Sequence, residues 1–191
     1  MTALTLQLTK PTHLSDDEFY DFCRANADLR IERNTKGELI IMPPTGGETG
    51  RRNVSIILQL GNWNQQAGIG EVFDLSTAFK LPNGADRSPG ASWITSKRWN
   101  TLTTEQKEKF PPICPDFVVE LRSASDRLAP LQSKMLEYID NGARLGWLIN
   151  RQDQQVEIYR PNRTTEVLTN PLRLSGDLVL KGFELKLSGI L

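Results

Sequence analysis

The chain has 191 residues, of which 38% are hydrophobic and 24% are charged, and this composition is typical of one globular domain. Lys and Arg together number 23, as do Asp and Glu, so the chain has no excess of positive charge that would point to nucleic-acid binding. A local basic patch is still compatible with this balance. No run of about 18 apolar residues occurs, so we expect no transmembrane helix.

Histidine and cysteine are too few and too scattered to build a metal or catalytic site. The single histidine, His13, lies in a stretch without clear periodicity, so neither a zinc site nor a His-dependent triad is expected. Cys23 and Cys114 have neither metal-ligand spacing nor a disulfide framework. The first residues lack the basic-then-apolar pattern of a signal peptide. We therefore expect a cytoplasmic protein with reduced thiols and no membrane contact.

The first third of the chain predicts an arm, a helix, a hairpin and a long helix. Residues 1–14 form the arm, and Ser15-Asp16-Asp17-Glu18 is a capping box that starts a helix ending near residue 27. Strands are expected at 29–33 and 38–42. After two prolines and two glycines, an amphipathic helix is expected over 48–66. Its first turn contains Glu48, which the helix dipole favours without any functional role.

The middle of the chain predicts short elements that lead to a central strand. We expect strands at 71–74, 78–81 and 87–94, and helices at 96–102 and 103–109. The central strand covers 114–123, where the apolar run Phe117-Val118-Val119 is typical of a covered strand. Glu120 follows directly and shares a face with Asp116 and Val118, because side chains alternate along a strand. The alternative is that Glu120 lies at a solvated strand end.

A helix expected over 128–141 presents Lys134 and Tyr138 on one face, because they are four residues apart. A strand that ends in an acid, followed by a helix that offers a lysine, predicts a site for a divalent metal and a phosphate. The remaining strands are expected at 145–150, 155–160, 165–168, 178–180 and 183–187. The whole chain, 1–191, then forms a single α/β domain of α+β character, with one curved mixed sheet and a long helix on each side.

Several stretches together resemble a known family. They are Pro43–Glu48, Phe79–Gly84, Arg87-Ser88-Pro89, Pro115–Ser123, Lys134–Tyr138 and Gly142–Ile149. Over roughly residues 14–190 the chain resembles the putative restriction endonuclease family of small proteins, within the PD-(D/E)XK nuclease superfamily. The resemblance implies a restriction endonuclease-like core and metal-dependent hydrolysis of phosphodiesters in DNA. By analogy it also implies Mg²⁺ or Mn²⁺ as cofactor and a possible homodimer.

The resemblance also assigns site residues. Glu120 matches the second metal-binding acid, Lys134 matches the catalytic lysine, and Glu48 matches an acid on the first long helix that can reach the metal through water. Arg122 stands where many nucleases have the lysine, and its guanidinium stays protonated. Tyr138 matches an aromatic position beside the lysine and could equally be a core residue.

The chain departs from the family pattern at Gly90. The pattern Arg-Ser-Pro-Asp is here Arg87-Ser88-Pro89-Gly90, so the first metal-binding acid is missing. Magnesium is usually held through one or two carboxylates, so metal binding should be weak. Asp86 lies four residues before Gly90, about 13 Å along a straight strand, and Asp116 lies equally far from Glu120 along its own strand, so neither is expected to substitute.

Three functions stay open at this stage. The first is a metal-dependent DNA endonuclease that is impaired by Gly90. The second is a non-catalytic protein that binds nucleic acid or a protein partner, and the third is a purely structural protein. Arg87, Arg122 and Tyr138 are the expected nucleic-acid contacts, although surface charge alone also explains an exposed arginine.

Overall fold

The structure is a computed structural model that describes residues 4–6 and 14–191. In these residues the helices are α1 (Asp16–Ala25), α2 (Gly47–Ala67), α3 (Ser96–Trp99), α4 (Thr104–Glu108) and α5 (Leu128–Asp140). The strands are β1 (Leu4–Leu6), β2 (Arg30–Arg33), β3 (Leu39–Met42), β4 (Gly70–Asp74), β5 (Phe79–Lys80), β6 (Asp86–Arg87), β7 (Ala91–Thr95), β8 (Phe117–Leu121), β9 (Leu145–Asn150), β10 (Gln155–Tyr159), β11 (Glu166–Thr169), β12 (Arg173–Ser175) and β13 (Glu184–Lys186). Most of the predicted arm, including His13, lies outside the described residues.

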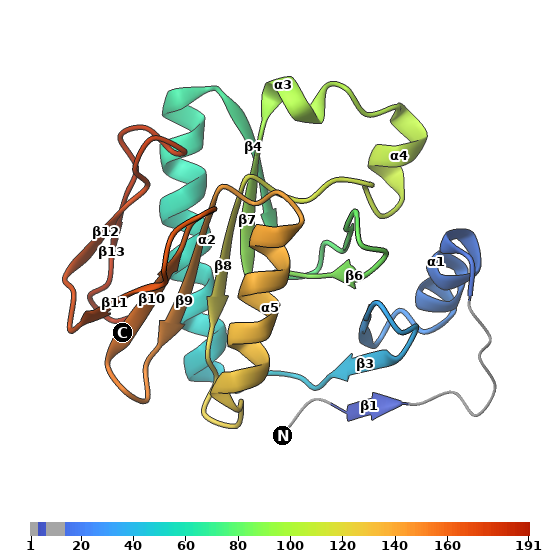
Figure 1. Ribbon diagram of the computed structural model, residues 1–191, viewed down its shortest axis with the longest axis horizontal. Helices are drawn as coiled ribbons and strands as arrows, with labels where there is room; N and C mark the ends of the chain where they lie inside the picture. The colour runs from blue at the N-terminus through green and yellow to red at the C-terminus, as the bar shows by residue number, and fades with distance from the viewer. Residues whose placement is uncertain (1–3, 7–13) are drawn as a thin grey trace.

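A six-stranded mixed sheet forms the centre of the molecule, in the order β11-β10-β9-β8-β7-β4. Strands β8 and β9 are parallel, and the other neighbours are antiparallel. Helix α2 covers one face and α5 covers the other (Figure 1). The prediction of a mixed sheet with a long helix on each side is therefore confirmed.

Alternation along β8 divides its side chains between the two faces. Phe117 and Val119 belong to the core under α2, where Leu60 and Trp147 also pack. Val118 packs in the core under α5. Glu120 points to this same α5 side, so the face predicted for it from the strand pattern is the observed one.

A second, five-stranded sheet lies beside the first, in the order β1-β3-β2-β6-β5, so the prediction of one sheet is wrong. The strand expected at 87–94 is two strands: β6 pairs in the five-stranded sheet and β7 in the six-stranded sheet. The chain passes between the sheets at Ser88-Pro89-Gly90. Proline has no N–H for a strand ladder, which is a physical reason for the break at this point.

The end of the chain also differs from the prediction. Strand β12 pairs with β13, and only the second was expected. Residues 178–180, predicted as a strand, form a turn in which the Leu180 N–H donates to the Gly176 carbonyl at 3.0 Å. Leu178 is 90% exposed, so its apolar side chain was a misleading indication of a buried strand. The predicted capping box at Ser15 is present, with hydrogen bonds in both directions to Glu18.

No helix in the described part of the chain is long and apolar enough to cross a membrane.

Candidate active site

Glu120 lies in β8 beneath α5 and is only 8% exposed, which rules out the alternative of a solvated strand end. Its Oε1 atom lies 2.8 Å from Nζ of Lys134. The Tyr138 hydroxyl donates to the same oxygen at 3.3 Å. The predicted shared face of Lys134 and Tyr138 is therefore present, and both side chains meet the acid of the central strand.

Lys134 is buried, and its ammonium contacts two carboxylates. Besides Glu120, Nζ lies 2.7 Å from Oε1 of Glu32, and it donates to the Ser88 carbonyl at 3.3 Å. Burial alone would lower the pKa of Lys134, but Glu120 and Glu32 outweigh burial and raise this pKa. Lys134 is therefore held as an ammonium, not as a free base.

Glu32, in β2 of the other sheet, is the member of the cluster that the sequence did not predict. It is 3% exposed. Its Oε1 also accepts a hydrogen bond from the Ser88 N–H at 3.0 Å, and its Oε2 lies 3.1 Å from Nη1 of Arg87. An acid within a short strand is only a weak indication of a functional residue, because the partner that reveals its role, Lys134, lies 102 residues further along the chain. Only the fold brings the two together.

The two acids respond to this environment in opposite directions. Burial would raise the pKa of Glu32, but Lys134 and Arg87 lower it below the ordinary value. For Glu120, burial dominates and raises the pKa, although Lys134 opposes the change, and the nearby Glu32 charge adds to the increase. Glu120 is therefore the acid that takes up a proton more readily.

Position 90 lies beside Glu120. Ala91 pairs with Val119, so extending this register by one residue sets position 90 opposite Glu120. A Cβ atom at Gly90 would lie 3.9 Å from Cα of Glu120 and 3.0 Å from the Val119 carbonyl oxygen. Residues directly opposite each other in antiparallel strands project to one face, so an acid here would point towards the Glu120 side.

The residues that are present do not fit a divalent metal. Gly90 offers no ligand, and the described residues contain no group of three Asp, Glu, His or Cys side chains placed to hold an ion. The Lys134 ammonium lies between the carboxylates of Glu32 and Glu120, so the positive charge that they attract is already supplied by the protein.

The other acids considered from the sequence have partners elsewhere. The Glu48 side chain is 69% exposed in the first turn of α2 and pairs with Arg52 at 2.7 Å and Arg51 at 3.1 Å. Asp86 pairs with Arg33 at 2.7 Å. Asp116 accepts from the Thr95 N–H at 2.9 Å and pairs with Arg98 at 3.0 Å. The structure does not bring these three into the cluster, and a role of Glu48 through water stays a prediction.

The expected nucleic-acid contacts are largely buried. Arg87 bridges Glu32 and Glu137, with Nε 2.6 Å from the Glu137 carboxylate. Arg122 binds the side chains of Asn150 and Asp153. Tyr138 is 0% exposed. Contact of these three residues with nucleic acid stays a prediction. It would require Arg87 and Arg122 to give up their present partners and Tyr138 to leave its buried position.

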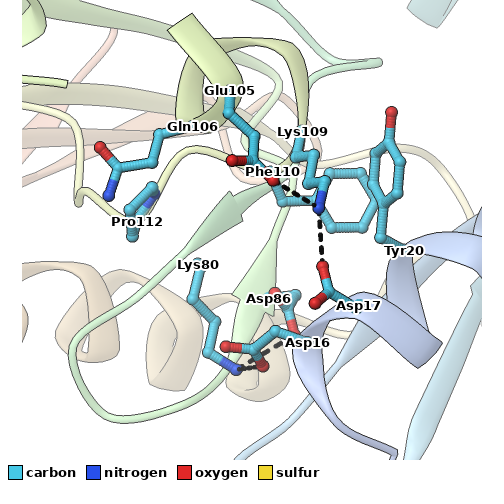
Figure 2. Close-up of a pocket in the computed structure, with 10 residues that line it drawn as sticks. All are labelled: Asp16, Asp17, Tyr20, Lys80, Asp86, Glu105, Gln106, Lys109, Phe110 and Pro112. Atoms are coloured by element: carbon cyan, nitrogen blue, oxygen red, sulfur yellow. Dashed lines mark hydrogen bonds and ion pairs between the residues drawn. The ribbon is translucent and has the colours of Figure 1, made fainter. Parts of the chain in front are cut away.

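A pocket of about 300 Å³ lies apart from this cluster, between α1, α4 and the turn at β5 (Figure 2). Its lining does not include Glu32, Glu120 or Lys134. Its charges pair with each other: Lys109 lies 2.8 Å from Asp17 and 3.1 Å from Glu105, and Lys80 pairs with Asp16. We therefore do not include this pocket in the candidate active site.

Comparison with solved structures defines the class of fold. The crystal structure of a putative nuclease belonging to DUF820, from Anabaena variabilis, matches with a TM-score of 0.70 at 20% sequence identity, over 84% of this chain and 88% of that chain. The predicted restriction endonuclease-like fold is thereby confirmed.

The family follows from the sequence model of Uma2, described as putative restriction endonuclease, which matches residues 16–188. The chain belongs to this family. A search of curated proteins found no match.

Proposed function

We propose that this protein is a member of the nuclease family in which metal-dependent phosphodiester hydrolysis is impaired, because its first metal-binding acid is replaced by Gly90. The observation that carries the proposal is that a Cβ atom at Gly90 would lie 3.9 Å from Cα of Glu120, the residue whose carboxylate pairs with Lys134. An acid at 90 would add a second carboxylate on the strand pair, and Mg²⁺ is usually held through one or two carboxylates together with substrate phosphates. Without it, only Glu120 of the expected pair remains.

DNA is the proposed substrate, and Mg²⁺ or Mn²⁺ is the proposed cofactor of an intact site. If such a site held a metal, the metal would supply a bound water of lowered pKa and positive charge near the phosphate. By analogy with nucleases that cut both strands, we also propose a homodimer. A cytoplasmic location accords with the two free cysteines, one of them buried.

The test is cleavage of supercoiled plasmid DNA in Mn²⁺ and in Mg²⁺. It compares the unchanged chain with Gly90→Asp, Gly90→Asn and the double variant Gly90→Asp/Glu120→Ala. Asparagine has the size of aspartate without its charge, so the two substitutions should cause the same steric strain at position 90. We expect cleavage only in Gly90→Asp. Equal cleavage by the Asn variant, or by the double variant, would contradict the proposed roles of position 90 and Glu120.

A second candidate is a non-catalytic protein that binds nucleic acid. The observation that favours a non-catalytic role is the Lys134 ammonium, which pairs with both Glu32 and Glu120. DNA binding that falls steeply with salt, with no cleavage in any variant, would select this function.

A further inference from the structure

Arg30 is a basic side chain on the face of β2 that carries Glu32. The two residues are separated by one position, so their side chains leave the strand on the same side. Ile31 and Arg33 leave on the other side: Ile31 packs with Phe19 of α1, and the Arg33 guanidinium lies over the Phe19 ring. Arg30 is therefore directed towards the side of the sheet where Glu32 meets the candidate active site.

Arg30 differs from the neighbouring basic residues because its side chain has no partner among residues 4–6 and 14–191. Arg33, Arg87 and Lys134 each contact two carboxylates. In the part of the chain that the structure describes, Arg30 makes no side-chain hydrogen bond or ion pair, and its Nε is buried without an acceptor. A buried donor without an acceptor is costly, so an incoming anion would satisfy a group that the protein leaves unmet.

The positive charge of Arg30 also reaches Glu120. Burial raises the pKa of the Glu120 carboxyl, and Lys134 is the main charge that opposes this increase. Arg30 adds to that opposition. The Arg30 charge therefore acts on the carboxyl that pairs with Lys134, and Arg30 leaves β2 on the same side as Glu32, the other partner of Lys134.

We propose that Arg30 binds a phosphate group of DNA beside the Glu120–Lys134 pair. This inference rests on the proposed function, because a nuclease must hold a phosphodiester at this site. A guanidinium suits the role, since its planar set of donors matches two phosphate oxygens at once.

The test is the binding of a short fluorescent DNA duplex to the full chain, followed by anisotropy over a series of salt concentrations without divalent metal. The variants are Arg30→Met, Arg30→Lys and, as a matched control, Arg163→Met in the exposed turn between β10 and β11. We expect Arg30→Met to weaken binding and to reduce the slope of log K against log salt by about 0.9, the contribution of one phosphate contact. Arg30→Lys should keep the slope and lose affinity, and the control should change neither.

The outcomes separate this inference from the function on which it rests. If the unchanged chain binds DNA and both Arg30 variants bind equally well, the Arg30 inference is overturned and the proposed function stands. If the unchanged chain does not bind DNA at low salt, both are overturned. If melting shows that Arg30→Met folds poorly, Arg30→Lys decides: reduced affinity at an unchanged slope supports the contact, and unchanged affinity rejects it.

Discussion

At the scale of single residues, the central feature of the candidate site is one ammonium that contacts two buried carboxylates. Lys134 contacts Glu32 and Glu120 at nearly equal distances, 2.7 and 2.8 Å. The acids nevertheless differ, because Glu32 also accepts from the Ser88 N–H and pairs with Arg87, whereas the further partner of Glu120 within the described residues is the Tyr138 hydroxyl. The better-stabilised carboxylate is therefore the one that the sequence did not indicate.

This difference predicts the pH dependence of Glu32→Gln. The folded pKa of Glu32 is lowered from 4.5, so its carboxylate contributes stability that is present above pH 4.5 and is lost as the pH falls through the folded pKa. At pH 7 we expect Glu32→Gln to lower the free energy of unfolding by about 1.5–3 kcal/mol, the usual range for a hydrogen bond to a charged group. Urea unfolding at pH 7 and again at acidic pH measures both values.

Glu120→Gln is the matched control for this experiment. The folded pKa of Glu120 is raised, so its contribution to stability is present below pH 4.5 and is lost as the pH rises through the folded pKa. At pH 7 the Gln substitution should therefore cost less at 120 than at 32. A loss for Glu32→Gln that is the same at pH 7 and at acidic pH would contradict the assignment of Glu32 as an ionised acid.

At the scale of elements, local patterns predicted β8 and α5 well. The apolar run before Glu120 and the four-residue spacing of Lys134 and Tyr138 are properties of neighbouring residues, and the structure keeps both. Glu32 could not be predicted in the same way, because its partners lie on β6 and α5, far along the chain. The break at Pro89 was also missed, since residues 87–94 read as one continuous strand until pairing assigns them to two sheets.

The junction between β6 and β7 predicts a cost for any side chain at position 90. A Cβ atom at Gly90 would lie 3.0 Å from the Val119 carbonyl oxygen, and this backbone atom cannot turn away as a flexible side chain can. We expect Gly90→Ala to lower the free energy of unfolding by roughly 1–3 kcal/mol, the range for overpacking. Chemical denaturation measures this change.

Gly61→Ala provides the comparison for Gly90→Ala. Gly61 lies within α2, and a Cβ atom there would meet no atom within 4 Å. We expect this substitution to stabilise the protein by about 0.5–1 kcal/mol, because alanine is the better helix former. A stabilising effect at both glycines would show that the close approach at position 90 does not constrain the chain.

At the scale of the whole molecule, the cluster joins the two sheets. Lys134 comes from the helix that covers the six-stranded sheet, whereas Glu32 and Arg87 come from the five-stranded sheet beside it (Figure 1). Arg87 extends the connection to Glu137, also on α5. Buried ion pairs are weak evidence for net stability, since desolvation offsets much of their attraction. Their clearer consequence is geometric, because Glu32 and Lys134 also bind the N–H and the carbonyl of Ser88, where the chain crosses from β6 to β7.

Position 90 therefore matters both for the packing of the fold and for the proposed metal site. A side chain at position 90 would lie beside Glu120, where the proposed function expects an acid and this chain has glycine. Because Asp and Asn impose the same strain at position 90, their comparison isolates the charge of the missing carboxylate.

The most direct measurement is calorimetric titration of Mn²⁺ and Mg²⁺ into the unchanged chain, Gly90→Asp and Gly90→Asn. We expect a binding isotherm in the Asp variant and little or no heat in the other two. Equal binding by the Asp and Asn variants, or no binding by Gly90→Asp when its melting temperature shows a folded protein, would contradict the claim that Gly90 is the missing metal ligand.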